Sequence, residues 1–266
     1  MTRARRDGLM SAAEDARMRD GLMSAAEYAR MRDAEDVHWW YLALRSLVAH
    51  ELRRWGGRGG APRVLDAGCG TGGGLARWTR TLGTRCYGID LAHEALSRCR
   101  ERGERLIAQA SVEALPFRGD AFDAVVSLDV LCLEGIDESR ALAEIRRVLR
   151  PGGLLVLNLP AFEILRGQHD RAVRIRRRFA RDEVEGLVRA NGFRVVRASY
   201  WNTILFPAVW LIRRLRRSGG RPTSDLLGLP VPMNATLAWL LQVERKLLGA
   251  VQPPFGTSVL CVATRA

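Results

Sequence analysis

The chain has 266 residues, of which 47% are hydrophobic and 27% charged, and it contains 26 glycines and 10 prolines. This composition is typical of a globular protein and excludes collagen-like, coiled-coil and wholly disordered chains. The formal net charge is +13, and much of it lies between Arg166 and Arg221, where fifteen arginines accompany only four acids. Both a solvated basic face and an anion-attracting surface remain open for that stretch.

Cysteine usage and hydropathy limit the compartment. The five cysteines are odd in number and form no C-x-x-C pair, so the sequence predicts neither a disulfide framework nor a zinc site, and we expect no metal. We therefore expect a reducing compartment, the cytoplasm. The longest apolar run, Ile204–Ile212, has nine residues and includes Pro207, whereas a membrane-spanning helix needs about 20. We expect no export signal or transmembrane segment.

The N-terminal region contains a tandem repeat. Asp7–Arg19 recurs as Asp20–Arg32, and the two copies differ only at Asp15 and Tyr28. Each copy carries an S-x-x-E capping box that permits a helix start. Thirteen residues at about 100° per residue rotate the second copy by roughly 220°, so the copies cannot share one face of a single helix. We predict that only the second copy continues into a packed helix containing residues 37–41, and that residues 1–19 are dispensable for activity.

Beyond position 60, short apolar runs alternate with amphipathic stretches. The expected strands are 63–68, 85–90, 105–110, 122–129, 153–160, 193–200 and 258–263, and the expected helices are 74–81, 93–101, 137–149 and 181–190. This alternation predicts an open α/β fold, a parallel sheet with helices on both faces. We divide the chain into an N-terminal repeat and helical lid (1–60), a core (61–201), a helical cap insertion (202–254) and a final core strand (255–266).

The strongest chemical signal is VLDAGCGTGGG, Val64–Gly74, where the first core strand leads into a helix. Gly68, Gly70 and Gly73 satisfy G-x-G-x-x-G, a pattern that by itself also permits a dinucleotide such as NAD. Asp66 separates the two possibilities, because a carboxylate is poorly placed beside a pyrophosphate but can accept the amino group of an amino-acid moiety. The glycines would let backbone amides at the helix N-terminus approach that ligand's carboxylate.

A second acid, Asp90, ends the next strand, 24 residues after Asp66. An acid at this place in an open α/β fold accepts hydrogen bonds from ribose hydroxyls. Both possible ligands contain a ribose, so Asp90 is required in either case.

Further motifs follow the glycine-rich loop in order: EALPF (113–117), FDAVVSLDVL (122–131), EIRRVLRPGG (144–153) and NGF (191–193). In this combination the chain resembles the class I S-adenosylmethionine-dependent methyltransferases, from about His38 to the C-terminus. The resemblance implies a Rossmann-like α/β fold with a seven-stranded, mostly parallel sheet whose last strand is antiparallel. It also implies an N-terminal helical lid, a helical insertion before the last strand, S-adenosylmethionine as cofactor, and methyl transfer to a small-molecule or lipid-linked acceptor.

The resemblance assigns cofactor-binding residues to positions of this chain. Those at the methionine end are Asp66, Gly68, Gly70 and Gly72, with Cys69 in the same loop. Those around the nucleoside are Asp90 at the ribose, Leu91 beside the adenine, and Ser111 and Val112 at the adenine edge. Asp129, after the fourth strand, would face the methyl donor, although a helix-capping or loop role is also open for it.

Catalytic candidates come from two segments that the chain shares with a bacterial, type 11-like group of these enzymes. They are His38 and Tyr41 in the HWWY segment, and His169 and Asp170 in the HD…RR-aromatic segment. Two positions depart from that group. Cys132-Leu133 replaces Glu-His and Arg174-Ile175 replaces Gly-His, so two proton acceptors are missing. Either the acceptor needs little help from a base, or His38, His169 or Asp170 supplies it.

Positioning is expected to dominate the chemistry. Holding the nucleophile in line at about 3 to 3.5 Å supplies roughly 7 to 11 kcal/mol, whereas a general base contributes roughly 10²- to 10⁴-fold in rate. Trp39, Trp40 and Tyr41 would close over the site and exclude water, or would only anchor the N-terminal helix in the core.

The segment Tyr200–Arg217 joins aromatic, apolar and basic residues. One interpretation is an interfacial segment that meets an anionic membrane through Arg213, Arg214, Arg216 and Arg217. The other, which we favour, is a cap whose apolar face packs on the sheet and whose arginines are solvated. Arg171, Arg174 and residues 176–178 could alternatively bind an anionic group of the acceptor.

Two alternative functions remain. A cyclase or isomerase would keep the cofactor pocket without transferring the methyl group. An RNA methyltransferase would use the basic tract, but nucleic acid is disfavoured because no RNA-binding module is evident. The oligomeric state is not readable from the sequence.

Overall fold

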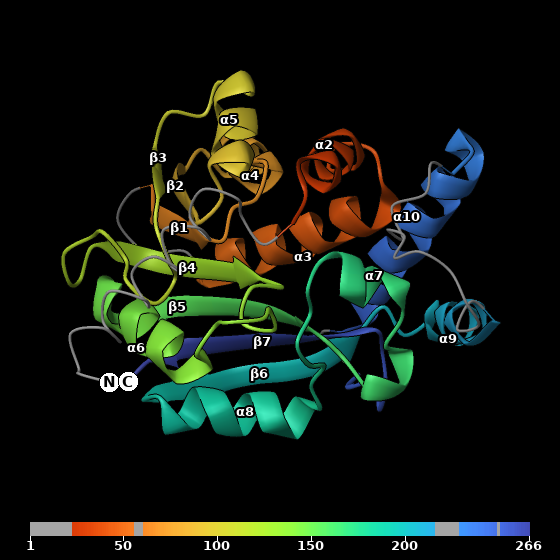
Figure 1. The fold of residues 1–266 in the computed structure, drawn as a ribbon. Helices are drawn as coiled ribbons and strands as arrows, with labels where there is room; N and C mark the ends of the chain where they lie inside the picture. The colour runs from red at the N-terminus through yellow and green to blue at the C-terminus, as the bar shows by residue number, and fades with distance from the viewer. Residues whose placement is uncertain (1–22, 56–60, 216–228, 249–250) are drawn as a thin grey trace, which may run out of the picture.

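The computed structural model describes residues 23–55, 61–215, 229–248 and 251–266. Its centre is a seven-stranded sheet in the order β3-β2-β1-β4-β5-β7-β6 (Figure 1). The strands are β1 Arg63–Ala67, β2 Arg85–Asp90, β3 Ile107–Gln109, β4 Phe122–Leu128, β5 Leu149–Pro160, β6 Phe193–Trp201 and β7 Ser258–Arg265. The pairs among β1 to β5 are parallel, whereas β7 is antiparallel to both β5 and β6. The predicted fold class, including the antiparallel last strand, is confirmed.

Helices cover both faces of this sheet (Figure 1). They are α2 Ala25–Ala34, α3 Trp39–Trp55, α4 Gly73–Leu82, α5 His93–Glu101, α6 Glu138–Val148, α7 Gln168–Ala172, α8 Arg181–Ala190, α9 Phe206–Leu215 and α10 Val231–Leu247, with a 3₁₀ turn η1 at Glu163–Leu165. Two apolar cores result. One contains the buried side chains of α6 and α8, and the other contains those of α3, α4 and α5.

Alternation along the strands explains why both cores form. In β1, Leu65 and Ala67 belong to the α6–α8 core, and Val64 belongs to the α3–α5 core. Asp66 therefore points to the same side of the sheet as Val64, and it is buried at 4% exposure. A carboxylate at a core-facing position of a central strand is the first structural sign of a binding site.

Local differences from the predicted elements have local causes. The helix predicted for 137–149 begins at Glu138, because the carboxylate of Asp137 caps it by accepting from the N–H groups of Ser139 and Arg140 at 2.9 and 3.0 Å. It ends before Leu149, which instead pairs with Phe122 and starts β5. Cross-strand pairing thus lengthens β5 at the expense of the helix.

The N-terminal helix is not continuous, which corrects the prediction for residues 37–41. The second repeat copy forms α2 with Ser24 as its N-cap, but α2 ends at Ala34 and α3 begins only at Trp39. Val37 lies in the break and is 61% exposed. The start of α3 is capped by side chains, since His38 Nδ1 accepts from Trp40 N–H at 3.3 Å and Asn234 Oδ1 accepts from Trp39 N–H at 2.8 Å. The first repeat copy lies outside the described residues.

The orientation of α9 also corrects a prediction. The expected cap would place its apolar face on the sheet and its arginines in solvent. Instead Arg213 points inward, where one guanidinium nitrogen donates to the carbonyl of Leu165 at 2.6 Å, while Leu211 and Leu215 are 51% and 72% exposed. Arg216 and Arg217 lie outside the described residues. Within the described chain no helix combines the length and the hydrophobicity needed to cross a bilayer.

Candidate functional site

A glycine-rich loop connects β1 to α4 at the carboxyl edge of the sheet. Gly68, Gly70 and Gly72 adopt positive φ angles of 98°, 54° and 82°, a region that favours glycine. A Cβ on Gly68 would also lie 2.2 Å from Cγ2 of Val130, just after β4. The glycines therefore let the loop backbone approach the end of β4, where a ligand at the carboxyl edge would sit.

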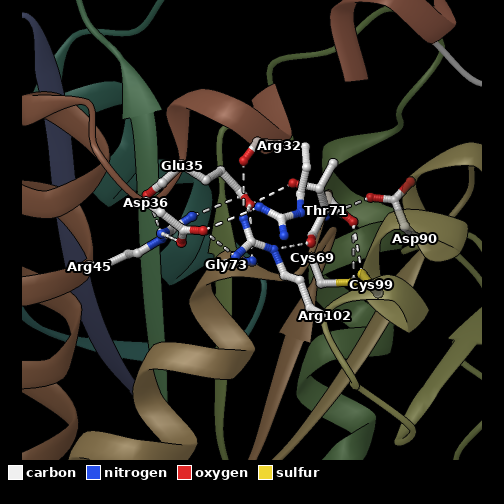
Figure 2. Close-up of polar contacts among 11 residues, drawn as sticks. Arg32, Glu35, Asp36, Arg45, Cys69, Thr71, Gly73, Asp90, Cys99 and Arg102 are labelled. Carbon is white, nitrogen blue, oxygen red and sulfur yellow. Dashed lines mark hydrogen bonds and ion pairs between the residues drawn. The ribbon is translucent and has the colours of Figure 1, made fainter. Parts of the chain in front are cut away.

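Cys69, in the same loop, packs against α5. The thiol of Cys99 donates to the carbonyl of Gly70 at 3.2 Å, and Cys69 lies beside it (Figure 2). The interaction with Cys99 and burial together raise the pKa of Cys69, so its thiol stays protonated. This position makes Cys69 a contact between the loop and α5.

Asp90 connects the loop to the end of β2. Its Oδ2 accepts from Gly70 N–H at 2.9 Å (Figure 2). Its Oδ1 accepts from Ala92 N–H at 2.9 Å. Burial raises the pKa of Asp90 to about 6, although the backbone N–H groups oppose this rise. Each oxygen still has a second lone pair, so the carboxylate can accept the ribose hydroxyls expected of it.

The predicted nucleoside-binding residues lie close to Asp90. β2 and β3 pair so that Asp90 is opposite Gln109, and the Gln109 side chain donates to the carbonyl of Leu91 at 2.9 Å. Ser111 and Val112 follow β3 after one intervening residue, and Val112 is buried. The structure therefore brings these sequence-predicted positions to one corner of the carboxyl edge.

Asp66 is the most unusual acid of the site. It is buried, and its Oδ1 has no hydrogen-bond partner among the described residues. Burial, and then the negative charge of Glu35, raises the pKa of Asp66 to about 8, with a smaller contribution from Asp90. A buried carboxyl group without a partner is costly unless a ligand supplies one. A cation fits this position, as the ammonium group of S-adenosylmethionine would.

Asp129 follows β4 and is held in an uncommon conformation. Its φ of 56° lies in the left-handed region, and its Oδ1 accepts from Asn158 Nδ2 at 3.0 Å. The other end of that amide, Oδ1, accepts from Trp201 Nε1 at 2.7 Å, and the Trp201 ring stacks on Trp40 at 6.2 Å between centroids. Burial raises the pKa of Asp129 to about 7, against the lowering effects of Asn158 and Arg178.

Asn158 and Trp201 were missed by the sequence analysis. Asn158 lies inside a strand that reads as an apolar run, and Trp201 follows the expected strand 193–200, in the segment that was interpreted as a cap or an interfacial segment. Only the register of the folded sheet shows that they link the HWWY segment to Asp129.

The break between α2 and α3 places Glu35 on the glycine-rich loop (Figure 2). Its Oε2 accepts from the Thr71 hydroxyl at 2.5 Å, from Gly73 N–H at 3.1 Å and from Arg102 at 3.0 Å. Its Oε1 pairs with Arg45 at 3.0 Å. Glu35 thus occupies the N-terminus of α4, where its charge is favoured.

This network changes the expected use of the loop amides. The Gly73 N–H, which the sequence pattern would offer to a ligand carboxylate, donates to Glu35 instead. A Cβ on Gly73 would lie 2.0 Å from a guanidinium nitrogen of Arg45, so glycine is needed here for close approach of Arg45. Glu35, Arg45 and Arg102 had no readable signal in the sequence, because they come from three separate places: the end of α2, the middle of α3 and the end of α5.

Helix α2 covers the same loop. The sulfur of Met31 would contact a Cβ on Gly70 at 3.1 Å, and Tyr28 is buried against Ala92 and Ala95 of the α5 region. Glu27 is 3% exposed and its Oε1 has no hydrogen-bond partner within the described part of the chain. The repeat copy with Tyr28 therefore packs on the site, and Glu27 brings a second incompletely paired carboxylate there.

The two catalytic candidates of the HWWY segment lie together. The ring centroids of His38 and Tyr41 are 6.2 Å apart, and the Arg45 guanidinium lies 5.5 Å from the Tyr41 ring centroid. Burial and the charge of Glu35 raise the pKa of Tyr41, so its phenol remains a hydrogen-bond donor at neutral pH. His38 acts as the cap of α3 through Nδ1.

The other two candidates, His169 and Asp170, lie on α7. Asp170 is fully buried and accepts from Arg178 Nε at 2.7 Å, with Arg213 at 3.5 Å. Although burial raises it, the pKa of Asp170 is held below its ordinary value by Arg178 and Arg213. This ion pair gives Asp170 a positioning role for α7 and α9 and makes it a poor proton acceptor. His169 is half-buried on the same helix.

The two departures from the type 11-like group are neighbours in space. Leu133 and Ile175 form an isolated antiparallel bridge, and Arg176 N–H donates to the carbonyl of Cys132 at 2.7 Å. Cys132 and Ile175 are buried, so an apolar contact takes the place of two histidines. The two replacements lie against each other in the structure, although they are far apart in the sequence. Three of the arginines predicted to bind an acceptor anion are in ion pairs, Arg176 and Arg177 with Glu138, and Arg178 with Asp170.

Known proteins resemble the chain at three levels. A family model described as a methyltransferase domain matches residues 65–157. Malonyl-[acyl-carrier protein] O-methyltransferase of Geobacter sulfurreducens is 33% identical over 188 residues, which cover 62% of this chain and 69% of that protein. Phthiotriol/phenolphthiotriol dimycocerosates methyltransferase 1 of Mycobacterium ulcerans is 35% identical over 133 residues, 47% of this chain and 48% of that protein. The chain thus spans about half the length of this mycobacterial relative.

The solved structure of geranyl diphosphate C-methyltransferase from Streptomyces coelicolor, in complex with Mg²⁺, geranyl diphosphate and S-adenosyl-L-homocysteine, matches with a TM-score of 0.52. It is 19% identical, and the match covers 83% of this chain and 78% of that one, which supports the fold alone. The Geobacter relative has a higher sequence identity than this structure, 33% against 19%, and the match covers more than two thirds of that protein. Its identity, the family model and the geometry of Asp66 and Asp90 lead to one conclusion: the chain belongs to the class I S-adenosylmethionine-dependent methyltransferases.

Proposed function

We propose that the protein transfers a methyl group from S-adenosylmethionine to a small-molecule or lipid-linked acceptor. The observation that carries this proposal is the buried Asp66 carboxyl group, which lacks a partner on Oδ1 and has a pKa raised to about 8. A cationic amino group from the cofactor would supply that partner and ionise Asp66. When bound, the cofactor supplies an electrophilic methyl group on a sulfonium.

The residues around this position have separate tasks. Asp66 would hold the amino group, Asp90 the ribose and Asp129 the side of the site that faces the methyl donor. Trp40 stacks on Trp201 and makes an edge contact with Tyr41, so this aromatic wall would exclude water from the acceptor side. In-line positioning of the acceptor then supplies most of the rate enhancement.

Proton removal from the acceptor is assigned to Asp129 or to a histidine. With a pKa of about 7, Asp129 is partly ionised at neutral pH and can accept a proton. His38 and His169 are the other candidates from the sequence, while Tyr41 and Asp170 are better suited to hydrogen bonding and positioning.

The names of two relatives support the acceptor class. One specifies malonyl-[acyl-carrier protein] and the other phthiotriol/phenolphthiotriol dimycocerosates. We infer an acceptor that is similarly attached to a lipid or a carrier. The five cysteines are free and buried, which supports a reducing compartment such as the cytoplasm.

A second candidate function, cyclisation or isomerisation with the cofactor bound but unreacted, is favoured by one observation. The Leu133–Ile175 contact leaves that part of the site apolar where the related group has two histidines. Such a reaction needs binding of the cofactor but not its consumption.

The test is to incubate the protein with S-adenosylmethionine and with candidate acyl-carrier-protein-linked and lipid acceptors, and to measure S-adenosylhomocysteine together with the mass of the acceptor. Methyl transfer predicts equal amounts of S-adenosylhomocysteine and methylated acceptor. If instead the acceptor is rearranged with unchanged mass and no S-adenosylhomocysteine forms, the protein acts as a cyclase or isomerase and not as a methyltransferase. Methylation of tRNA with a steep salt dependence would favour the RNA alternative.

A further inference from the structure

Exposed apolar side chains are concentrated on the cap insertion. Of the fifteen large hydrophobic residues that are exposed in the described chain, ten lie between Ile204 and Phe255. No residue of α9 is buried, although eight of its ten residues are apolar. A soluble monomer rarely leaves apolar side chains gathered in this way unless they meet a partner.

The exposed residues of α9 form a stripe along one side. Pro207, Leu211 and Leu215 follow one another at four-residue spacing, and Ala208 and Ile212 lie beside them at the same spacing. Leu211, Ile212 and Leu215 are 51%, 47% and 72% exposed. We call these five residues the α9 stripe. Helical geometry places all of them within a single face.

Anchoring of the opposite side explains why this stripe faces outward. Arg213 donates to the carbonyl of Leu165 at 2.6 Å and reaches Asp170 Oδ2 at 3.5 Å. The ring of Phe206 packs against those of Phe162 and Phe255, with centroid distances of 6.0 and 5.2 Å. An amphipathic helix of a globular protein usually turns its apolar side to the core, so an inward-facing arginine with an exposed apolar stripe indicates a second environment for α9.

The charges beside the α9 stripe are positive. Arg214 lies next to it with its guanidinium 5.7 Å from the ring centroid of Trp210, and α9 has no acidic residue. On α10, Trp239 is 63% exposed and Lys246 is also exposed. The one acid of α10, Glu244, is buried and accepts from the N–H groups of Thr203 and Ile204. These hydrogen bonds tie the start of α9 to α10, so both helices present an apolar and cationic surface.

We propose that the α9 stripe, together with the exposed residues of α10, docks on an anionic membrane surface. The stripe enters the headgroup region, and Arg214 and Lys246 meet the phosphate groups of anionic lipids. A second copy of this chain is a weaker match, because docking like on like would bring two cationic rims together. Self-association is therefore an outcome of the test below.

Docking in this orientation has a consequence for the acceptor. Arg213 links the inner side of α9 to Asp170, which pairs with Arg178, and Arg178 in turn acts on the charge of Asp129. The membrane-facing helix thus lies next to the acceptor side of the site. In this respect the inference rests on the proposed function and deepens it: the acceptor would be taken from the lipid phase. Docking itself does not require methyl transfer.

Vesicle co-sedimentation of the full chain tests the proposal. Wild-type protein should bind vesicles of phosphatidylcholine with phosphatidylglycerol more strongly than phosphatidylcholine alone, and high salt should weaken this binding toward the level of phosphatidylcholine alone. The double variant Leu211→Asp and Leu215→Asp should lower the partition coefficient about tenfold or more, since it puts charges at the exposed stripe. The matched control is Leu106→Asp, at a residue 44% exposed before β3, which should bind as wild type.

Three results would overturn the docking proposal. They are no partition of wild type, equal partition of the double variant, and a wild-type dimer that the double variant turns into a monomer without any vesicle binding. Binding of S-adenosylmethionine, measured by calorimetry on each variant, checks that the fold is intact. If the wild type does not bind S-adenosylmethionine, the proposed function is contradicted. The vesicle result still tests docking in that case.

Discussion

At the scale of single residues, the site concentrates carboxyl groups that burial keeps partly protonated. The pKa values of Asp66, Asp90 and Asp129 are raised to about 8, 6 and 7, in each case mainly by burial. Such groups destabilise the protein without ligand and favour a cationic ligand. Replacing one of these acids should therefore raise the stability of the ligand-free protein and lower its affinity for the ligand. Each acid can be tested by its own substitution.

Asp66→Asn should stabilise the ligand-free protein at neutral pH. In the native state Asp66 keeps its proton up to about pH 8, whereas in the unfolded chain it loses the proton near its ordinary value of 3.8. The native state thus binds more protons, and the free energy of unfolding falls as the pH rises across this window. Urea unfolding at pH 5, 6.5 and 8 should show a smaller fall for the variant. An equal or steeper fall would mean that Asp66 is ionised in the native protein.

Asn158→Ala should shift the pH dependence of catalysis. The Asn158 amide lowers the pKa of Asp129, so its loss should move the acidic limb of kcat to higher pH, measured at saturating cofactor. The control is Ser127→Ala on the adjacent strand, which removes a buried hydrogen bond of 3.0 Å to the carbonyl of Ala67. Both variants should lose about 1 to 3 kcal/mol of stability, but only Asn158→Ala should shift the profile. If the pH profile of Asn158→Ala coincides with that of the wild type, Asp129 takes no part in proton transfer.

At the scale of elements, the sheet was predictable and the lid was not. Alternating apolar runs and the Val64–Gly74 loop predicted β1, α4 and the position of Asp90, because these signals are local in sequence. The break before α3 depends on Glu35 reaching Thr71 and Gly73, which are 36 and 38 residues away. Which face of α9 turns inward depends on the ion pair between Arg213 and Asp170. Periodicity identifies an amphipathic helix but cannot reveal a distant ion-pair partner.

Helix α2 should act as part of the cofactor site. Tyr28→Asp makes the second repeat copy identical to the first and would bury a carboxylate against Ala92 and Ala95. We expect α2 to lose its packing and the affinity for S-adenosylmethionine to fall about tenfold or more, as measured by calorimetry. Asp15→Ala changes the same position of the first copy and should leave affinity unchanged. Unaltered binding by Tyr28→Asp would show that α2 is not needed.

At the scale of the whole molecule, we predict that the N-terminal region divides into a dispensable part and a required one. Deletion of residues 1–19 should leave cofactor affinity and methyl transfer intact, because α2 begins only at Ala25 and is capped by Ser24. Deletion of residues 1–35 removes Glu35 and should weaken both, since Arg45 and Arg102 lose their shared carboxylate partner. Activity assays and thermal unfolding of the two truncations provide the comparison. An inactive 1–19 deletion would contradict this division.

The overall arrangement places two environments at one end of the sheet. Helix α2 lies over the proposed cofactor site at the carboxyl edge, and α9 and α10 lie at the same end of the molecule (Figure 1). Helices α9 and α10 expose apolar and basic residues. Asp170, Arg178 and Arg213 connect the two through ion pairs centred on the buried Asp170. This continuity is the physical basis for our proposal that the acceptor approaches from a lipid surface.

The central claim is that the acids at the carboxyl edge hold an amino-acid nucleoside. Calorimetric titration of the wild type and of Asp90→Ala with S-adenosylmethionine and with NAD tests it most directly. The wild type should bind S-adenosylmethionine saturably with proton release at pH 7, Asp90→Ala should bind it with an affinity about tenfold or more lower, and NAD should not bind. Preferential binding of NAD, or equal affinity of the variant for S-adenosylmethionine, would contradict it.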